Sequence, residues 1–97
     1  LRADPEGNAQ IGDNKCVDEE LAVASDLVIV TADEIVPELS KAELVAPFVD
    51  VVVPAPLGAA PTSCHPLYPL DAQAVLEYAE KVSDPESLAR YLDRWLA

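Results

Sequence analysis

The sequence contains no methionine, three glycines, one histidine and one tryptophan among its 97 residues. Basic residues are also scarce, with six against 18 acidic residues and a formal net charge of -12. Nucleic-acid backbones and anionic membrane surfaces are both bound by clusters of lysine and arginine. The shortage of basic residues therefore argues against either partner.

Other expected signals are missing as well. No apolar run reaches the roughly 18 residues that a membrane-spanning helix needs. The two cysteines, Cys16 and Cys64, stand 48 positions apart, which matches neither a CxxC motif nor a zinc-site spacing. We expect two reduced thiols in a cytoplasmic protein. The hydrophobic content of 51% excludes a disordered acidic tail.

Two β-branched runs indicate the fold class. Residues 27–31 and 48–53 are short, continuous apolar runs, which are typical of strands buried on both faces of a parallel sheet. Residues 37–44 lie between them and, with Pro37 at the first position, predict two helical turns in the crossover. The predicted fold is α/β, with an open, mainly parallel sheet flanked by helices.

Turn and helix signals surround these strands. Residues 3–8 predict a tight turn, 9–11 a short strand and 17–25 a helix. Five prolines in 54–70 exclude a helix there and favour a stiff, packed loop. Asp71 and Asp84 are expected to cap two helices that follow. The last helix carries an apolar stripe that we expect to pack in a core or at an interface between subunits: Leu88, Tyr91, Leu92, Trp95 and Leu96.

No complete active site is visible in the residue chemistry. Cys64 and His65 are a poor nucleophile pair, because adjacent side chains of an extended segment point to opposite faces. Ser63 and His65 share a face, but the sequence has no GxSxG elbow. A packing or hydrogen-bonding role for His65 is favoured over a catalytic one. The sequence also lacks a P-loop, a GxGxxG motif and the spacing of a calcium loop, so we expect no metal site.

The order of three motifs is informative. ADPEGNAQ (3–10) is followed by DLVIVTADEIV (26–36), then by VDVVVPAPLGAAPTSC (49–64), Tyr68 and the helix capped by Asp71. This succession resembles the C-terminal third of the α subunit of family I CoA-transferases, the glutaconate and 3-oxoacid CoA-transferase type. With the absent methionine, it leads us to expect that 1–97 is a C-terminal segment, a single incomplete domain.

The resemblance implies an activity and a set of partners. Such enzymes move CoA between an acyl-CoA and a carboxylic acid through a glutamyl-CoA intermediate, and the glutamate belongs to the partner half. We therefore expect no catalytic residue here, no permanently bound cofactor, and a CoA thioester as substrate. The expected partners are a β subunit and the remainder of the α subunit, in a hetero-oligomer. The resemblance places the following residues at the substrate site: Asn8, Thr62, Ser63, His65 and Tyr68.

Two alternatives stay open at this point. The first is a CoA-thioester hydrolase of the same fold. The second is a small acidic interaction module that has no chemistry of its own and binds a basic partner surface.

Overall fold

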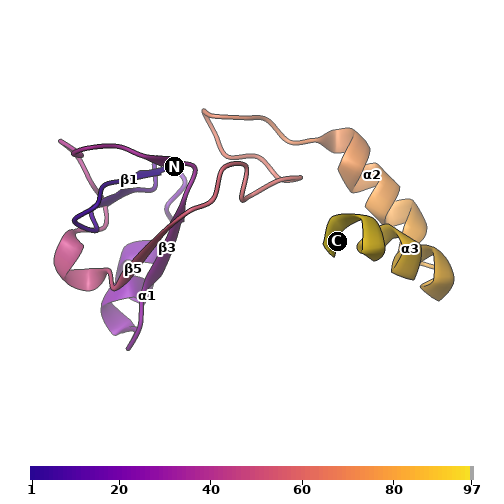
Figure 1. Ribbon diagram of the computed structural model, residues 1–97, viewed down its shortest axis with the longest axis horizontal. Coiled ribbons are helices and arrows are strands. Elements are labelled where there is room, and N and C mark those ends of the chain that lie inside the picture. Colours follow the sequence, from indigo (N-terminus) through magenta and orange to yellow (C-terminus); the bar gives the residue numbers. More distant parts are fainter. Residues whose placement is uncertain (97) are drawn as a thin grey trace. The chain divides into compact units, whose positions relative to one another are not determined.

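The computed structural model describes residues 1–96 and shows two compact units, Leu1–Gly58 and Ala59–Ala97. The first unit holds the paired strands and a short helix, and the second holds an irregular loop followed by two helices (Figure 1). The structure has the mixed α/β composition that the sequence predicts. No helix within residues 1–96 has the length and apolar character needed to cross a membrane.

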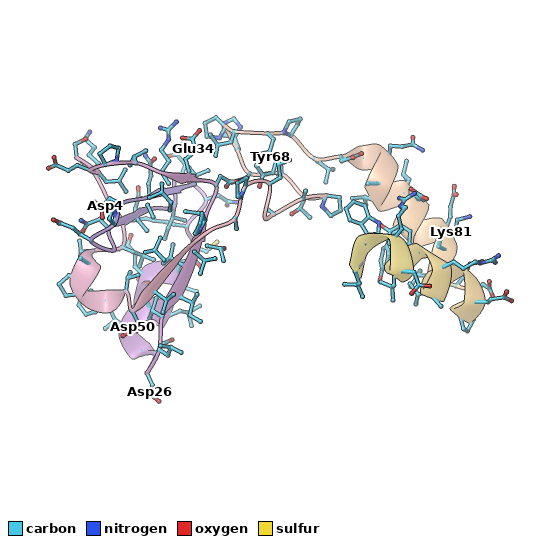
Figure 2. The ribbon with its side chains drawn as sticks, viewed as in Figure 1. Asp4, Asp26, Glu34, Asp50, Tyr68 and Lys81 are labelled. Carbon is cyan, nitrogen blue, oxygen red and sulfur yellow. The ribbon has the colours of Figure 1, made fainter. Side chains whose placement is uncertain are left out.

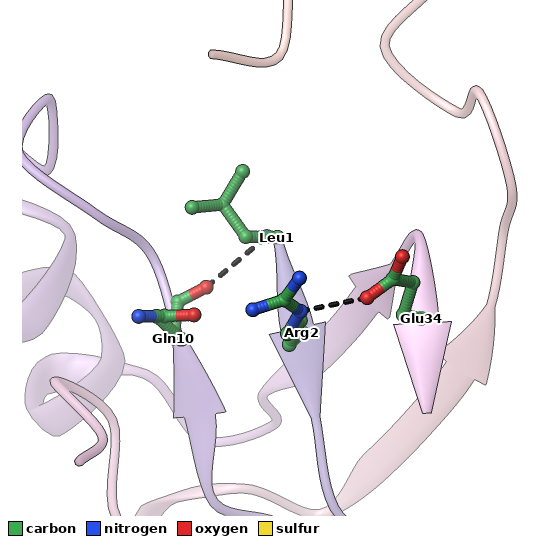
Figure 3. Close-up of polar contacts among 4 residues, drawn as sticks. All are labelled: Leu1, Arg2, Gln10 and Glu34. Atoms are coloured by element: carbon green, nitrogen blue, oxygen red, sulfur yellow. Dashed lines mark hydrogen bonds and ion pairs between the residues drawn. The ribbon is translucent and has the colours of Figure 1, made fainter. Parts of the chain in front are cut away.

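A three-stranded sheet occupies one side of the first unit. Strand β1 (Arg2–Ala3) lies between β2 (Ala9–Gln10), to which it is antiparallel, and β4 (Glu34–Ile35), to which it is parallel. The backbone nitrogen of Leu1 donates to the Gln10 carbonyl at 3.1 Å, and Arg2 Nε lies 2.6 Å from Glu34 Oε2 (Figure 3). These contacts extend the pairing beyond the ladder itself.

The second sheet of the first unit is the predicted parallel pair. Strand β3 (Ile29–Ala32) pairs with β5 (Val51–Pro54) in the register Ile29 to Val51 and Ala32 to Pro54. The prediction that both faces of this sheet are buried is wrong within residues 1–96, because Ile29 is 56% exposed while Ala32 is 1% exposed. The alternation of a strand places only every second residue in the core.

The core of the first unit is built from alanine. Ala3, Ala9 and Ala32 are at most 2% exposed, and half-buried Val30, Leu44 and Val52 pack around them. Small side chains at these positions allow the backbones of β1, β2 and β3 to approach closely. Much of the large apolar surface stays exposed, including Leu21 and Val23 on helix α1 (Asp18–Ala24).

The crossover between β3 and β5 differs from the prediction. Residues 37–44 form no helix; a short 3₁₀ helix at Ala46–Phe48 precedes β5 instead. The backbone nitrogens of this segment have partners elsewhere: Leu39 donates to the Asp4 carboxylate at 3.2 Å, and Leu44 donates to the Ala9 carbonyl at 3.1 Å. The tertiary hydrogen bonds replace the helical ones, which explains why local propensity fails here.

The second unit contains the two predicted helices. Helix α2 (Ala72–Lys81) begins at Asp71, whose carboxylate accepts from Ala74 N at 3.0 Å. Helix α3 (Pro85–Leu96) begins after Asp84, whose carboxylate accepts from Ser87 N at 2.9 Å. Both predicted caps are therefore confirmed. The helices lie side by side after a turn at 82–84 (Figure 1).

Candidate functional site

The turn at residues 4–8 is organised by one buried carboxylate. Asp4 is 1% exposed, and its Oδ1 accepts from Glu6 N at 3.1 Å and from Asn8 N at 3.0 Å. Its Oδ2 accepts from Asn8 Nδ2 at 2.9 Å and from Leu39 N at 3.2 Å. Gly7 completes the turn with a φ of +104°, a backbone conformation that side chains disfavour.

The hydrogen bonds lower the pKa of Asp4. The largest contribution is the side-chain bond from Asn8, and the backbone donors of Asn8, Leu39 and Glu6 act in the same direction, while burial opposes them. Donors directed at a carboxylate favour its charged form. The Asp4 side chain is therefore an ionised structural group whose four acceptor positions are all used by the protein.

Asn8 is half-buried at the end of this turn, and its side chain makes hydrogen bonds both within the turn and to the segment before β5. Its Nδ2 donates to Asp4, and its Oδ1 accepts from Ala46 N at 3.0 Å. The amide thus joins the turn to the 3₁₀ helix that precedes β5. These bonds leave Asn8 one amide hydrogen and one carbonyl lone pair for a ligand. Its predicted place at the substrate site stays a prediction.

A surface pocket of about 360 Å³ adjoins the turn. Its walls come from the turn itself, from the end of β4 and from β5 with the residues before it, and the lining residues include Glu6, Gly7, Ile35, Asp50 and Val52. Asp50 lies directly before β5, where its carboxylate accepts from Val28 N at 2.8 Å. Figure 2 shows Asp4 and Asp50 on the first unit. The pocket is bounded by apolar strand residues and two carboxylates.

The loop that opens the second unit is held by its own hydrogen bonds. Cys64 and Tyr68 form an antiparallel bridge, with N–O distances of 3.0 and 3.1 Å. The Tyr68 hydroxyl accepts from Ala59 N at 3.2 Å, and Asp71 N donates to the Pro61 carbonyl at 2.9 Å. The prediction of an irregular segment without helix or central strand is confirmed for this loop, whereas the prediction that it packs is not, because most of its residues are exposed.

The remaining predicted site residues lie together in this loop. Tyr68 is half-buried and braces the loop, whereas Thr62, Ser63 and His65 are exposed. The Thr62 hydroxyl donates to the Ala59 carbonyl. Ser63 and His65 make no hydrogen bond or ion pair with another residue of 1–96. The loop therefore presents two unengaged polar side chains, while Asn8 belongs to the other unit.

The chemistry of these residues suits binding and not nucleophilic attack. His65 stands at the reversal between Cys64 and Tyr68, and none of the described contacts pairs it with Ser63 or Cys64. No group of three or more histidine, cysteine, aspartate or glutamate side chains within 1–96 is arranged to hold a metal ion. Hydroxyl and imidazole groups on an irregular loop can orient a polar substrate.

The sequence did not indicate that two aspartates, Asp4 and Asp33, accept long-range hydrogen bonds. The turn signal explains Asp4 only within residues 3–8, yet its carboxylate fixes Leu39, which lies 35 positions away. Asp33 follows β3 and accepts from Leu57 N at 3.0 Å, so it fixes the first residues of the loop that leaves β5. An aspartate directly after a strand is a signal for such a contact, but the partner comes from the folded chain.

The structure is a mixed α/β segment that matches the CoA-transferase fold. The crystal structure of glutaconate coenzyme A-transferase from Acidaminococcus fermentans matches 98% of this chain and 32% of its own, with a TM-score of 0.89 and 30% identity. A variant of the decarboxylase AibA/AibB matches 95% of this chain and 36% of its own, with a TM-score of 0.76 and 38% identity. No family model matches the sequence.

The sequence comparison agrees with the structural one. One of the subunits of glutaconate CoA-transferase from Acidaminococcus fermentans is 30% identical over 101 aligned positions, which cover 98% of this chain and 32% of that protein. An uncharacterised protein of Archaeoglobus fulgidus is 35% identical over 98% of this chain and 23% of its own length. The chain is a homologue of part of this CoA-transferase polypeptide, and it spans about a third or less of the relatives it matches.

Proposed function

We propose that this chain is the C-terminal segment, one incomplete domain over 1–97, of the α subunit of an enzyme that moves CoA between an acyl-CoA and a carboxylic acid. The observation that carries the proposal is the match to glutaconate coenzyme A-transferase, with a TM-score of 0.89 over 98% of the chain at 30% identity. A β subunit and the remainder of the α subunit complete the enzyme.

The reaction divides a hard transfer into easier covalent steps. A glutamate carboxylate attacks the acyl-CoA carbonyl, which forms an acyl-glutamyl anhydride and releases CoA thiolate. The thiolate then attacks the glutamyl carbonyl, which forms the glutamyl-CoA thioester and releases the first carboxylic acid. The second acid reverses these steps. We place this glutamate outside residues 1–97, in another segment or subunit.

The part of this chain in the reaction is to bind and orient the substrate. Ser63 and His65 supply a hydroxyl and an imidazole that no residue of 1–96 engages. Thr62 and Tyr68 shape the loop through their bonds to Ala59. Asn8 contributes from the turn held by Asp4. The enzyme is cytoplasmic, and its CoA thioester is a substrate and not a resident cofactor.

A decarboxylase is the second candidate, because a variant of the decarboxylase AibA/AibB is 38% identical over 95% of the chain. Such an enzyme would release carbon dioxide and would need no CoA exchange. A hydrolase of the same fold would release free CoA. The homology to enzyme subunits favours all three over a non-catalytic acidic module.

The three reactions are separated by one assay on the intact enzyme. The enzyme is incubated with an acyl-CoA and an acceptor acid, and hydroxylamine then traps any glutamyl thioester for peptide mass spectrometry. Transfer predicts a glutamyl hydroxamate on a residue outside 1–97 and exchange of CoA between acids. Free CoA or carbon dioxide without a trapped glutamate would support the hydrolase or the decarboxylase, and a label within 1–97 would contradict our assignment.

The loop residues are tested in the same enzyme. Replacing Ser63 by alanine or His65 by glutamine should lower kcat/KM by about tenfold each, as expected for a lost hydrogen bond to a charged substrate group. Ser40→Ala is the matched control, since Ser40 is exposed in the first unit and outside the loop. Unchanged kcat/KM in both loop variants would remove them from the site.

A further inference from the structure

An open surface pocket with unusual charge lies between the two helices of the second unit. The pocket measures about 320 Å³. Residues of both helices line it: Glu77, Lys81, Ser87, Arg90, Tyr91 and Arg94. Three of the six basic residues of the whole chain are in this lining, against one carboxylate, so the local charge is 3 - 1 = +2 in a chain of net charge -12.

The sequence spacing explains why these cations meet. Lys81 follows Glu77 by four positions on α2, and Arg94 follows Arg90 by four positions on α3, so each pair lies on one helix face. The rings of Tyr78 and Tyr91, with centroids 5.7 Å apart, connect the two helices. The packing of the two helices therefore brings Lys81 of α2 close to Arg90 and Arg94 of α3, in the lining of one pocket.

One of the three cations is already engaged. Arg94 Nη2 lies 2.9 Å from Glu77 Oε2, and its guanidinium carbon lies 5.6 Å from the ring centroid of Tyr91 and 5.7 Å from that of Trp95. An arginine between a carboxylate and two aromatic faces has a fixed position. Glu77 therefore pairs with Arg94 through Oε2 and lies on the same helix face as Lys81.

The other two cations form no ion pair within residues 1–96, and Glu77 and Glu86 each stand four positions before one of them. The side chains of Lys81 and Arg90 make no hydrogen bond or ion pair with any other residue of 1–96. Figure 2 shows Lys81 at the end of α2. Arg90 and Arg94 are like charges four positions apart, an arrangement that destabilises an isolated helix. An anion in the pocket would remove this repulsion.

We propose that this pocket binds a phosphate group, with Lys81 and Arg90 as its charged ligands and Arg94 as a fixed wall beside them. A phosphate carries more negative charge and more acceptor oxygens than a carboxylate, so it suits two or three converging cations better. The volume lies at the lower end of the range for small-molecule sites, which fits a phosphate monoester or a diphosphate. Inorganic phosphate compounds and the phosphates of a CoA substrate share this chemistry, and only the second source rests on the proposed function.

The test uses the intact protein and inorganic pyrophosphate, with binding followed by isothermal titration calorimetry at low ionic strength. We expect saturable binding that Lys81→Gln and Arg90→Gln each weaken by about tenfold. Lys41→Gln is the matched control, because it removes one positive charge from an exposed position in the first unit. The affinity of this control should stay within about twofold of the parent, since Lys41 is not among the residues that line the pocket.

We expect both variants to fold, since the side chain of neither replaced cation has a partner within 1–96. The helical circular dichroism signal of each variant checks its folding. Absence of saturable binding, or equal affinity in all three variants, would overturn the proposal. CoA and dephospho-CoA then distinguish the sources. Tighter binding of CoA that disappears in Arg90→Gln assigns the pocket to the CoA 3′-phosphate. Equal binding of the two that Arg90→Gln weakens alike assigns it to the CoA diphosphate. Binding of both that Arg90→Gln leaves unchanged, while pyrophosphate binding is weakened, assigns it to a separate phosphate compound.

Discussion

The side-chain amide of Asn8 donates to one oxygen of the Asp4 carboxylate at 2.9 Å, and the backbone nitrogen of Asn8 donates to the other at 3.0 Å. The two residues thus close the turn twice over. Because Asn8 also accepts from Ala46 N and Asp4 accepts from Leu39 N, the pair joins three separate parts of the first unit. The turn at residues 4–8 therefore holds Leu39 and Ala46, which are far from it in the sequence, in place by hydrogen bonds.

Replacing Asp4 by asparagine should weaken the hydrogen bonds that its carboxylate accepts in the first unit. The new amide nitrogen would face donors in place of an acceptor, so a buried polar group would lose its partner. We expect faster hydrogen exchange at the backbone amides of Asn8 and Leu39 in the intact protein. Asp13→Asn removes an exposed carboxylate and should leave both exchange rates unchanged. Equal rates in the parent and Asp4→Asn would contradict the described role.

The same carboxylate predicts a pH dependence. Folding lowers the pKa of Asp4 from its ordinary value of 3.8, so its ionised form favours the folded state. The contribution is complete above pH 3.8 and is lost as the pH falls below this value through the folded pKa. Unfolding measured against pH should show a smaller loss of stability below pH 3.8 in Asp4→Asn than in the parent.

The alanine core predicts sensitivity to added volume. Ala32 is 1% exposed in a cluster with Ala3 and Ala9, so Ala32→Val would force neighbouring backbones apart. We expect the free energy of unfolding of the intact protein to fall by about 1–3 kcal/mol. Ala24→Val, at an exposed position of α1, serves as the control and should cost about 0.5 kcal/mol through helix propensity alone. An unchanged denaturation midpoint for Ala32→Val would show that the site has room.

Helix α2 depends on its cap. Asp71→Ala removes the acceptor for Ala74 N and should lower the free energy of unfolding by about 1 kcal/mol. Asp71→Ser keeps an oxygen in reach of the same nitrogen and should recover most of that loss. Thermal unfolding followed by circular dichroism measures both variants. A serine variant as unstable as the alanine variant would argue against capping as the cause.

The ion pair between Arg2 and Glu34 should matter little, although its N–O distance is only 2.6 Å. The two side chains are 44% and 50% exposed, and exposed pairs contribute about 0–1 kcal/mol. Replacing Arg2 by glutamine should therefore change the free energy of unfolding by less than about 1 kcal/mol, and salt should remove most of the difference. A larger, salt-resistant loss would mean that the pair is shielded from water in the intact protein.

Local signals predicted the elements that local physics decides. Asp71 and Asp84 identified both helix starts, since a cap depends on the next three residues. The β-branched run at 27–31 identified β3, and its parallel partner followed from the second run. The helix predicted for 37–44 was wrong because the backbone nitrogens of Leu39 and Leu44 donate to Asp4 and Ala9. The neighbouring residues in the sequence do not indicate those long-range bonds.

The positions of the expected site residues in the fold were predictable only in part. Four of the five expected residues share one hydrogen-bonded loop, which the run of prolines between 54 and 70 already marked as irregular. The bracing of that loop by the Tyr68 hydroxyl and Ala59 N depends on a reversal that spacing does not reveal. The basic pocket was missed for another reason: its cations are spread over 81–94 and meet only when the two helices pack.

The exposed apolar residues of both units affect how mutational scanning of this segment should be interpreted. Accessibility ordinarily tells an experimenter which positions tolerate change. In this chain Val23 is 61% exposed and Leu76 is also 61% exposed, while Ala3 is fully buried. If the rest of the enzyme covers such positions, scores measured in the complete assembly will rank them among its least replaceable residues. Variant interpretation for this segment should then rest on the assembled neighbours of each side chain and not on the solvent exposure of the segment by itself.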